Sequence, residues 1–421
     1  MTTALTNQDF STLDPARFRL KVRSVLIAGQ MLAGLGMGAT LSVGALLATD
    51  LSGSAGWSGM AATLATLGAA LAAMPLANLA TTRGRSWSLA VGAWVAALGA
   101  LLAITATVVR VFSILLVSLL MLGVATAVNL QARFAATDVS TAGRRGTDLS
   151  LVVWATTVGA VTGPNLIAPG NQLGMWLGLP DLAGPFVITA MAQVAASLIY
   201  RVGLRPDPLA VSKAWAKDPS SGDQVMVEDR PVARRTAFVS ISLSHATMVG
   251  VMAMTPVHLV DHGASLVIVG FTISLHIAGM YALSPVFGIL ADRLGRIPTI
   301  LIGQALLGLS LLATGLGSEN SNWVIVGLIL LGLGWSASTV AGSTLLTEST
   351  SLDRRTRVQG FSDVMMSGSG AAGGALSGVI LLMVGYDGLS FIAMALVLAV
   401  VSHVLFWEWR GAKMAHSKAD H

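Results

Sequence analysis

Long apolar stretches without charged residues dominate this 421-residue sequence and constrain its fold more than any other feature. Many of them reach about 20 residues, the length that a helix needs to cross a bilayer. Hydrophobic residues make up 54% of the chain and charged residues only 11%, whereas soluble domains carry about 25% charged residues. The sequence therefore predicts an all-α membrane protein, and its net charge of +5 does not indicate nucleic-acid binding.

Hydropathy predicts about twelve transmembrane helices in two groups of six. The predicted spans are 23–49, 55–80, 87–109, 112–137, 148–172 and 183–203, then 235–260, 266–290, 297–317, 322–348, 359–384 and 387–409. We accordingly expect a cytoplasmic segment at 1–22, a six-helix half at 23–203 and a polar cytoplasmic linker at 204–234. A second six-helix half at 235–410 and a cytoplasmic tail at 411–421 complete the predicted organisation.

Lysine and arginine are distributed unequally between the two sides of the predicted helices. Of the 25 basic residues, only Arg110 falls in a connection on the opposite side, while Arg133 lies near a helix end. Positively charged connections stay in the cytoplasm, so we expect both termini there. We expect a multi-pass protein of the plasma membrane, which in a bacterium is the inner membrane.

The two halves repeat at an offset of about 210 residues, and charged residues recur in matching connections. The matching pairs are Pro75 with Pro285, Arg83 with Arg293, Asp138 with Glu348, Arg144-Arg145 with Arg354-Arg355 and, after one inserted residue, Gly84-Arg85 with Gly295-Arg296. Matching charged loops indicate an internal duplication of a six-helix unit.

The connection between the eighth and ninth spans carries a recognisable motif. Gly288-Ile-Leu-Ala-Asp292-Arg293-Leu-Gly295-Arg296 resembles the cytoplasmic loop motif of the major facilitator superfamily. That resemblance implies twelve helices, two parallel six-helix repeats and a substrate site between them near the bilayer midplane. In the first-half copy, Asn78 and Thr82 stand where the motif has glycine and aspartate.

Two sets of residues are candidates for controlling access to the site. An aspartate at a helix end interacts favourably with a neighbouring helix N-terminus, and arginines pair with carboxylates, so Asp292, Arg293 and Arg296 are predicted to close the cytoplasmic gate. Gly159, Gly163 and Pro164 resemble the glycine-proline motif of exporters in this superfamily, since small residues permit close helix approach and proline bends helices.

Methionine and histidine pairs occur at similar depth in the seventh and eighth spans. Met248 and Met252 are four residues apart, as are His276 and Met280, so each pair lies on one helix face. His245 lies one turn from Met248. Thioether sulfur and imidazole nitrogen favour Cu(I) over hard cations. A short loop joins the two spans, which predicts that the pairs come together, although methionine in a membrane helix is commonly packing.

The same pattern resembles the CcoA-like copper importers of the superfamily. That resemblance implies that Met248, Met252, His276 and Met280 bind copper as the transported substrate, and Cu(I) uptake is our first hypothesis. Relatives of this group also carry riboflavin, so the substrate stays open. The chain has no cysteine, so any thiol-assisted step of such importers is missing here.

The second hypothesis is transport of a small organic molecule, either an exported drug or metabolite or imported riboflavin. Trp335 and Tyr281 are candidates for stacking on a planar ring. Asn129, Gln131 and Arg133 form a polar stretch in the fourth span and are candidates for lining the substrate cavity. The alternatives for these residues are hydrogen bonds between helices and, for Trp335, helix packing.

Other functional classes fit the sequence poorly. It contains no Ser/His/Asp set, no metal-hydrolase spacing and no nucleophilic cysteine, so we expect no enzyme, no catalytic residues and no cofactor. No channel-type filter is visible. No acidic residue is expected at mid-depth, which leaves Asp363, His245 and His276 as candidates for proton coupling. The expected partners are the lipid bilayer and a small molecule or metal ion, and we expect a monomer.

Overall fold

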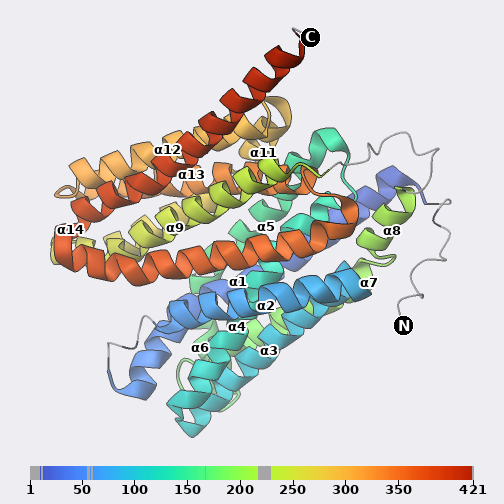
Figure 1. The fold of residues 1–421 in the computed structure, drawn as a ribbon. Coiled ribbons are helices and arrows are strands. Elements are labelled where there is room, and N and C mark those ends of the chain that lie inside the picture. The colour runs from blue at the N-terminus through green and yellow to red at the C-terminus, as the bar shows by residue number, and fades with distance from the viewer. Residues whose placement is uncertain are drawn as a thin grey trace. The chain divides into compact units, whose positions relative to one another are not determined.

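The computed structural model describes residues 10, 13–54, 57, 60–165, 167–216 and 229–419, and the regular elements within them are helices (Figure 1). The predicted all-α fold class is confirmed. Nine stretches of described residues are long and apolar enough to cross a membrane, and Leu352–Trp407 covers the last two predicted spans. The predicted spans lie on observed helices, with ends that differ by a few residues.

Contacts divide the chain into two compact units. Unit 1 contains Met1–Val227 and Ser351–Gly368, and unit 2 contains Glu228–Thr350 and Ser369–His421. The helices of the first range are α1 Pro15–Ser52, α2 Met60–Arg83, α3 Arg85–Val109, α4 Phe112–Thr137, η2 Ala142–Arg144, α5 Arg145–Asn165, α6 Ile167–Trp176, α7 Gly184–Gly203 and α8 Pro208–Trp215. Those that follow are α9 Pro231–Asp261, α10 Leu266–Tyr281, α11 Ser284–Arg293, α12 Arg296–Leu316, α13 Ser321–Glu348 and α14 Leu352–Ala419. The first turns of α14 thus belong to unit 1 and the remainder to unit 2.

Helix α4 is central to unit 1, because it contacts α1, α2, α3 and α5. Its apolar side joins a buried cluster that includes Leu26, Leu89, Val128 and Tyr200. Polar residues of α4 in the same buried region need partners on neighbouring helices, since unpaired polar groups are costly away from water.

Helix α13 has the corresponding position in unit 2, where it contacts α9, α10, α11 and α12. Small residues permit these contacts. A Cβ added at Gly334 would lie 2.8 Å from the carbonyl oxygen of Gly303 on α12. Helices α9 and α10 follow one another in the chain, yet each packs more extensively on α13 than on the other.

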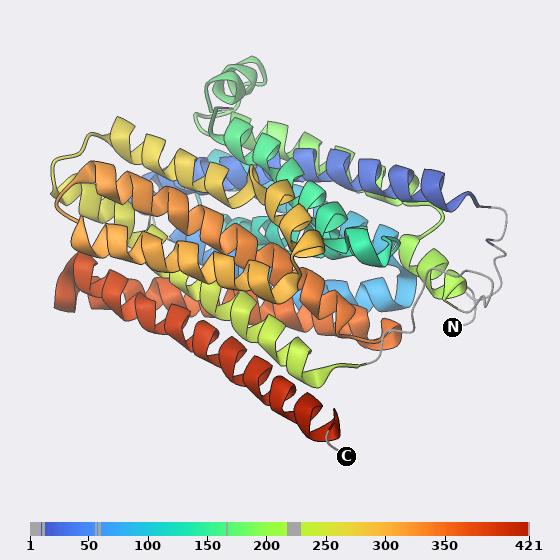
Figure 2. The same cartoon turned by 90° about the horizontal axis from the view of Figure 1, so that it is seen from above.

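In unit 2, one predicted span is interrupted, and the last two predicted spans are joined by a reversal, at residues with special backbone properties. The span predicted at 266–290 is divided into α10 and α11, and Pro285 lies at the start of α11. Proline cannot donate to the carbonyl of Tyr281, and the Ser284 hydroxyl donates to it instead, with Oγ 2.7 Å from the oxygen. Helix α14 changes direction at Gly385, where φ is 74° (Figure 2).

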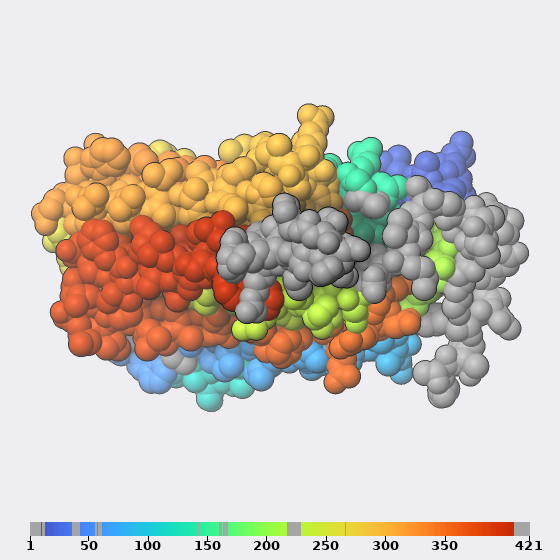
Figure 3. All heavy atoms as spheres, turned by 45° about the horizontal axis from the view of Figure 1, so that its top comes forward, coloured from blue at the N-terminus to red at the C-terminus, as the bar shows by residue number. Residues whose placement is uncertain are grey.

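After that reversal, the second part of α14 lies beside α12 at the surface of unit 2 (Figure 3). The hydroxyls of Thr314 on α12 and Ser390 on α14 are 2.9 Å apart and buried. This hydrogen bond fixes the two helices at one register, because both hydroxyls are shielded from water.

Helix α8 was not predicted, because its residues fall in the segment interpreted as a linker. Asp207 caps it, with Oδ1 accepting from the backbone N–H of Leu209 at 3.0 Å. Trp215 at its end makes an edge contact with Phe18 of α1. Helix α8 therefore packs on α1 within unit 1.

Candidate functional site

The predicted gating motif of unit 2 forms a compact ion-pair cluster. Arg296 begins α12 after Gly295, whose φ of 102° favours glycine. Its guanidinium donates to both carboxylate oxygens of Glu348, with Nη2–Oε1 at 2.7 Å and Nε–Oε2 at 3.0 Å. Nη1 also lies 3.1 Å from Oδ1 of Asp292 and donates to the carbonyl of Ala291. Arg296 thereby ties the ends of α11, α12 and α13 together.

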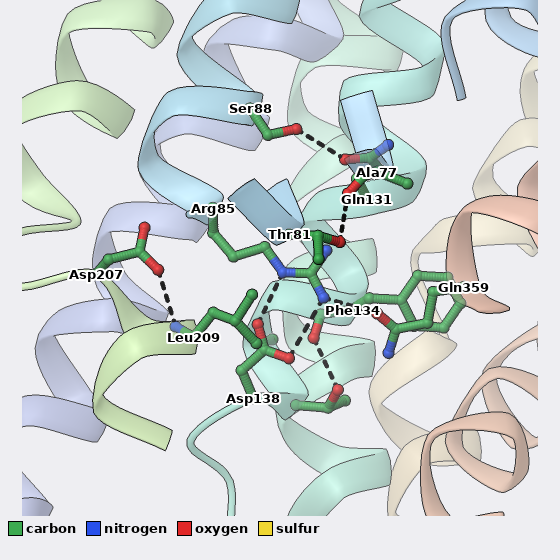
Figure 4. A network of polar contacts seen from close by, with 12 residues as sticks. Ala77, Thr81, Arg85, Ser88, Gln131, Phe134, Asp138, Asp207, Leu209 and Gln359 are labelled. Carbon is green, nitrogen blue, oxygen red and sulfur yellow. Dashed lines mark hydrogen bonds and ion pairs between the residues drawn. The ribbon is translucent and has the colours of Figure 1, made fainter. Parts of the chain in front are cut away.

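The first-half copy of the motif builds the same pair inside unit 1, as Figure 4 shows. Gly84 has φ of 93°, and the next residue, Arg85, donates to both oxygens of Asp138, with Nε–Oδ2 at 2.8 Å. Arg85 and Asp138 match Arg296 and Glu348 in the repeat. Both side chains are 1% exposed or less, so the pair is shielded from water and salt.

The two copies differ in the third partner of the arginine. In unit 1, Thr82 replaces the aspartate and bonds to its own helix at the carbonyl of Asn78. Nη2 of Arg85 instead donates to Oε1 of Gln359, in the first turns of α14, at 2.6 Å (Figure 4). The first-half motif, which lacks the glycine and the aspartate, therefore still forms a buried hydrogen-bond network around Arg85.

The remaining gating candidates have different surroundings. Arg293 is exposed and forms no ion pair with any described residue. Gly159 of α5 packs against the backbone of Gly34 in α1, and an added Cβ would be 2.6 Å from the nitrogen of Leu35. Gly163 and Pro164 lie outside the residues whose surroundings the structure describes. The gating roles of these residues stay predictions.

Two of the candidate cavity residues on α4 make hydrogen bonds to neighbouring helices. The Asn129 amide donates to Thr156 of α5 at 2.9 Å, and the Gln131 amide donates to the carbonyl of Ala73 in α2 at 3.0 Å. The Ser88 hydroxyl of α3 donates to Gln131 at 3.1 Å. These contacts account for the burial of both amides, and their contact with substrate stays a prediction.

Arg133, the third residue of the polar stretch, pairs with Asp363 inside unit 1. Nη2 of Arg133 lies 2.9 Å from Oδ1 of Asp363, and the two side chains are 2% and 0% exposed. Oδ2 of Asp363 has no hydrogen-bond partner among the described residues. The pair therefore places two opposite charges in a shielded environment with a single strong contact between them.

Three aromatic side chains from three helices meet in unit 2. The indole N–H of Trp335, near the middle of α13, donates to Nδ1 of His245 on α9 at 2.9 Å. The Trp335 ring also meets Tyr281 of α10 edge to face, with centroids 5.8 Å apart. Because an indole N–H only donates, Nδ1 of His245 accepts, and the proton of the neutral imidazole is on Nε2.

A glycine on α14 provides the space for this imidazole. A Cβ added at Gly370 would lie 2.6 Å from Cδ2 and 2.7 Å from Nε2 of His245. Gly368, two residues earlier, has nothing within 4 Å of an added Cβ. The aromatic cluster, defined as His245, Tyr281 and Trp335, thus depends on one specific small residue.

The methionine and histidine candidates lie on α9 and α10, two helices that both pack on α13. Met248 and Met280 are buried, Met252 is half-buried, and His276 is fully buried. Nδ1 of His276 donates to the carbonyl of Leu328 on α13 at 2.8 Å, and its Nε2 has no hydrogen-bond partner among the described residues. Within the described part of the chain, no three His, Asp or Glu side chains gather where they would hold one metal ion.

Sequence reasoning missed Gln359 and Gly370. The repeat offset matched Arg85 with Arg296 and Asp138 with Glu348 but did not predict the ion pair within each half. No signal in the sequence connects Gln359 to Arg85. Gly370 is one of 46 glycines, and only the packing of α14 on α9 distinguishes it from its neighbours.

Comparisons with a family profile and with known proteins agree on one family. The profile described as Major Facilitator Superfamily matches residues 26–281 and 237–420. The chain is 38% identical to the uncharacterized MFS-type transporter YddS of Bacillus subtilis over 398 residues, which are 93% of this chain and 91% of that protein. It is 26% identical over 395 residues to the riboflavin transporter RfnT of Brucella anthropi, covering 92% of this chain and 96% of that protein.

A solved structure shows the same fold at low sequence identity. The human organic anion transporter MFSD10 (TETRAN) superimposes with a TM-score of 0.73 and 15% identity, covering 92% of this chain and 99% of that one. This similarity concerns the fold alone.

Proposed function

This chain belongs to the Major Facilitator Superfamily and is a multi-pass membrane transporter, and we propose that its substrate is a small organic molecule with a planar ring. The observation that carries the proposal is the aromatic cluster of His245, Tyr281 and Trp335. Rings from three helices meet there and are held by the Trp335–His245 hydrogen bond. Trp335 is buried, and the half-buried rings of His245 and Tyr281 beside it would stack on an aromatic ligand.

The break between α10 and α11 supports the same location. Tyr281 is the last residue of α10, and the helix restarts at Ser284. Interrupted transmembrane helices are tolerated where they are buried in protein or line a cavity, and transporters place binding sites at such interruptions. The similarity to a protein named riboflavin transporter makes riboflavin, whose ring system is planar, the first substrate to test.

Trp335→Ala is expected to lower riboflavin uptake by about two- to tenfold, because aromatic pairing contributes roughly 0.5–1.5 kcal/mol beyond the area buried, and 1.4 kcal/mol is tenfold. Met248→Leu is expected to leave uptake unchanged, because leucine keeps the volume of methionine and removes only the sulfur. Labelled riboflavin uptake at matched expression measures both. Loss of transport in Met248→Leu with normal transport in Trp335→Ala would refute the proposal.

Gly370 and Gly368 give a matched pair of variants in the same assay. The methyl group of Gly370→Ala would meet the His245 imidazole and disturb the aromatic cluster, so uptake is expected to fall as in Trp335→Ala. Gly368→Ala adds the same methyl group to the same helix in open space and is expected to retain uptake. Equal uptake in the two variants would show that the position of His245 does not matter.

Cu(I) uptake is the second candidate, supported by the hydrogen bonding of His276. Metal-binding histidines commonly donate one ring N–H to a backbone carbonyl and bind the metal through the other nitrogen. His276 donates to Leu328 through Nδ1 and keeps Nε2 without a hydrogen-bond partner among the described residues. The similarity to YddS and RfnT adds nothing in favour of copper.

The copper hypothesis predicts that Met252→Ala and His276→Ala each reduce cellular copper uptake at equal expression, because each removes one soft donor. The measurement is copper content by mass spectrometry after a timed exposure. Undiminished uptake in both variants would eliminate this candidate and would not affect the riboflavin assay.

A further inference from the structure

Two arginines of unit 1 lie against one partly exposed indole ring. Trp87, in the first turn of α3, is 39% exposed. The guanidinium carbon of Arg201, in the last turn of α7, is 4.2 Å from the ring centroid, and that of Arg83, the last residue of α2, is 5.9 Å away. The ends of three helices therefore bring two positive charges to one aromatic surface.

This cluster has more positive charge than the described protein around it neutralises. Arg205 is close enough to Arg201 for their charges to repel each other. None of Arg83, Arg201 and Arg205 forms an ion pair with a described residue. The neighbouring carboxylate, Asp207, instead accepts from the backbone N–H groups of Ser86 at 2.8 Å and Leu209 at 3.0 Å.

The chemistry of the cluster selects an anion at the membrane surface. Tryptophan is enriched where lipid headgroups meet the hydrocarbon core, and Trp87 is at a helix end. A guanidinium that stacks on an aromatic face keeps its N–H donors at its edge, where they match the oxygens of a phosphate. Basic groups at the inner membrane surface attract anionic lipids.

The second half of the chain lacks the same combination. Arg293 is the repeat equivalent of Arg83, is exposed, and ends α11 in the same way. At the repeat equivalent of Trp87, the chain has Pro298. The combination of arginine with tryptophan is therefore specific to the α2–α3 connection and is not a general feature of the arginine-rich side.

We propose that Arg83 and Arg201, together with Trp87, form a binding site for the phosphate of an anionic phospholipid, with Arg205 adding positive charge nearby. The lipid phosphate accepts hydrogen bonds from the guanidinium groups while the indole contacts the glycerol region. The bound lipid bridges the ends of α2, α3 and α7. This site is separate from the aromatic cluster and does not depend on the identity of the transported substrate.

The test uses the purified full-length protein, with dioleoyl phosphatidylglycerol and dioleoyl phosphatidylcholine titrated separately in native mass spectrometry. Phosphatidylglycerol is expected to bind the double variant Arg83→Gln/Arg201→Gln about 30-fold more weakly than the unmodified chain, from the usual contribution of each basic residue near an anionic surface. Arg293→Gln is the matched control and is expected to bind as the unmodified chain does.

Two further arms distinguish a membrane lipid from a free phosphate ester as the bound anion. Glycerol 3-phosphate at equal ionic strength is expected not to shift the thermal unfolding temperature. Phosphatidylglycerol is expected to raise it in the unmodified chain and in Arg293→Gln, and not in the double variant. Equal binding of phosphatidylcholine, an equal loss in Arg293→Gln, or unchanged binding in the double variant would each overturn the proposal. Equal stabilisation by glycerol 3-phosphate would also overturn it, because the site would then bind free phosphate.

Discussion

Asp363→Ala is expected to destabilise the protein by about 3–5 kcal/mol, because it leaves the buried guanidinium of Arg133 without its carboxylate. The expectation follows from the exposure of the two side chains, 2% and 0%, and from their 2.9 Å contact. The measurement is the free energy of unfolding of the purified protein in a denaturing-detergent titration. The exposed pair of Arg110 and Asp50 is the control, and Asp50→Ala is expected to cost less than about 1 kcal/mol.

A double variant tests whether the charge or the packing is responsible. Arg133→Met combined with Asp363→Leu removes both charges and fills the volume with apolar atoms, so most of the lost stability is expected to return. Additive losses in the double variant would contradict a role for the charge pair, since they would mean that the side chains act independently.

Gly332→Ala is expected to destabilise the protein by about 2 kcal/mol or more, although alanine is the better helix former. An added Cβ would lie 2.9 Å from the nitrogen of Met280 and 3.1 Å from the carbonyl carbon of Gly279, and it would also meet the carbonyl oxygen of His276. These are backbone atoms of α10 and cannot rotate away, so α10 must move from α13. That movement also strains the hydrogen bond from His276 to Leu328.

Gly270 supplies a control on α10 itself, because an added Cβ there has nothing within 4 Å. Gly270→Ala is expected to be neutral or to stabilise the protein by up to about 1 kcal/mol, from helix propensity alone. Under identical conditions the thermal unfolding temperature should therefore fall in Gly332→Ala and stay unchanged or rise in Gly270→Ala. A shift of the same sign and size in both would mean that α10 and α13 are not in close contact at Gly332.

The candidate sites were only partly predictable from sequence. Internal duplication correctly paired Arg85 with Arg296 and Asp138 with Glu348, because the same local motif produces the same helix ends in both halves. The pairing of Asp363 with Arg133 was not predicted, since it joins residues 230 positions apart. Trp335 was singled out for its ring, but its hydrogen bond to His245 depends on how α9 and α13 are rotated.

The expected approach of the seventh and eighth spans illustrates the same limit. A short loop predicts that α9 and α10 are neighbours. Both pack more extensively on α13 than on each other, although α13 lies 40 residues or more further along the chain. Glycines of α13 and of its partners permit these close contacts. Which glycines do so is known only once the packing of the helices is known. Connection length restricts where a helix can lie without deciding which helix it contacts.

The sequence by itself determined the helical class, the positions of the spans and the repeated arginine motif, because hydrophobic length, helix breakers and charge act over a few neighbouring residues. Only the tertiary structure decided which polar side chains meet: Gln359 with Arg85, Asp363 with Arg133, and His245 with Trp335. In a membrane bundle most helix faces are apolar, so composition does not indicate how each helix is rotated about its own axis. Close packing of small residues and the pairing of buried polar groups fix that rotation instead.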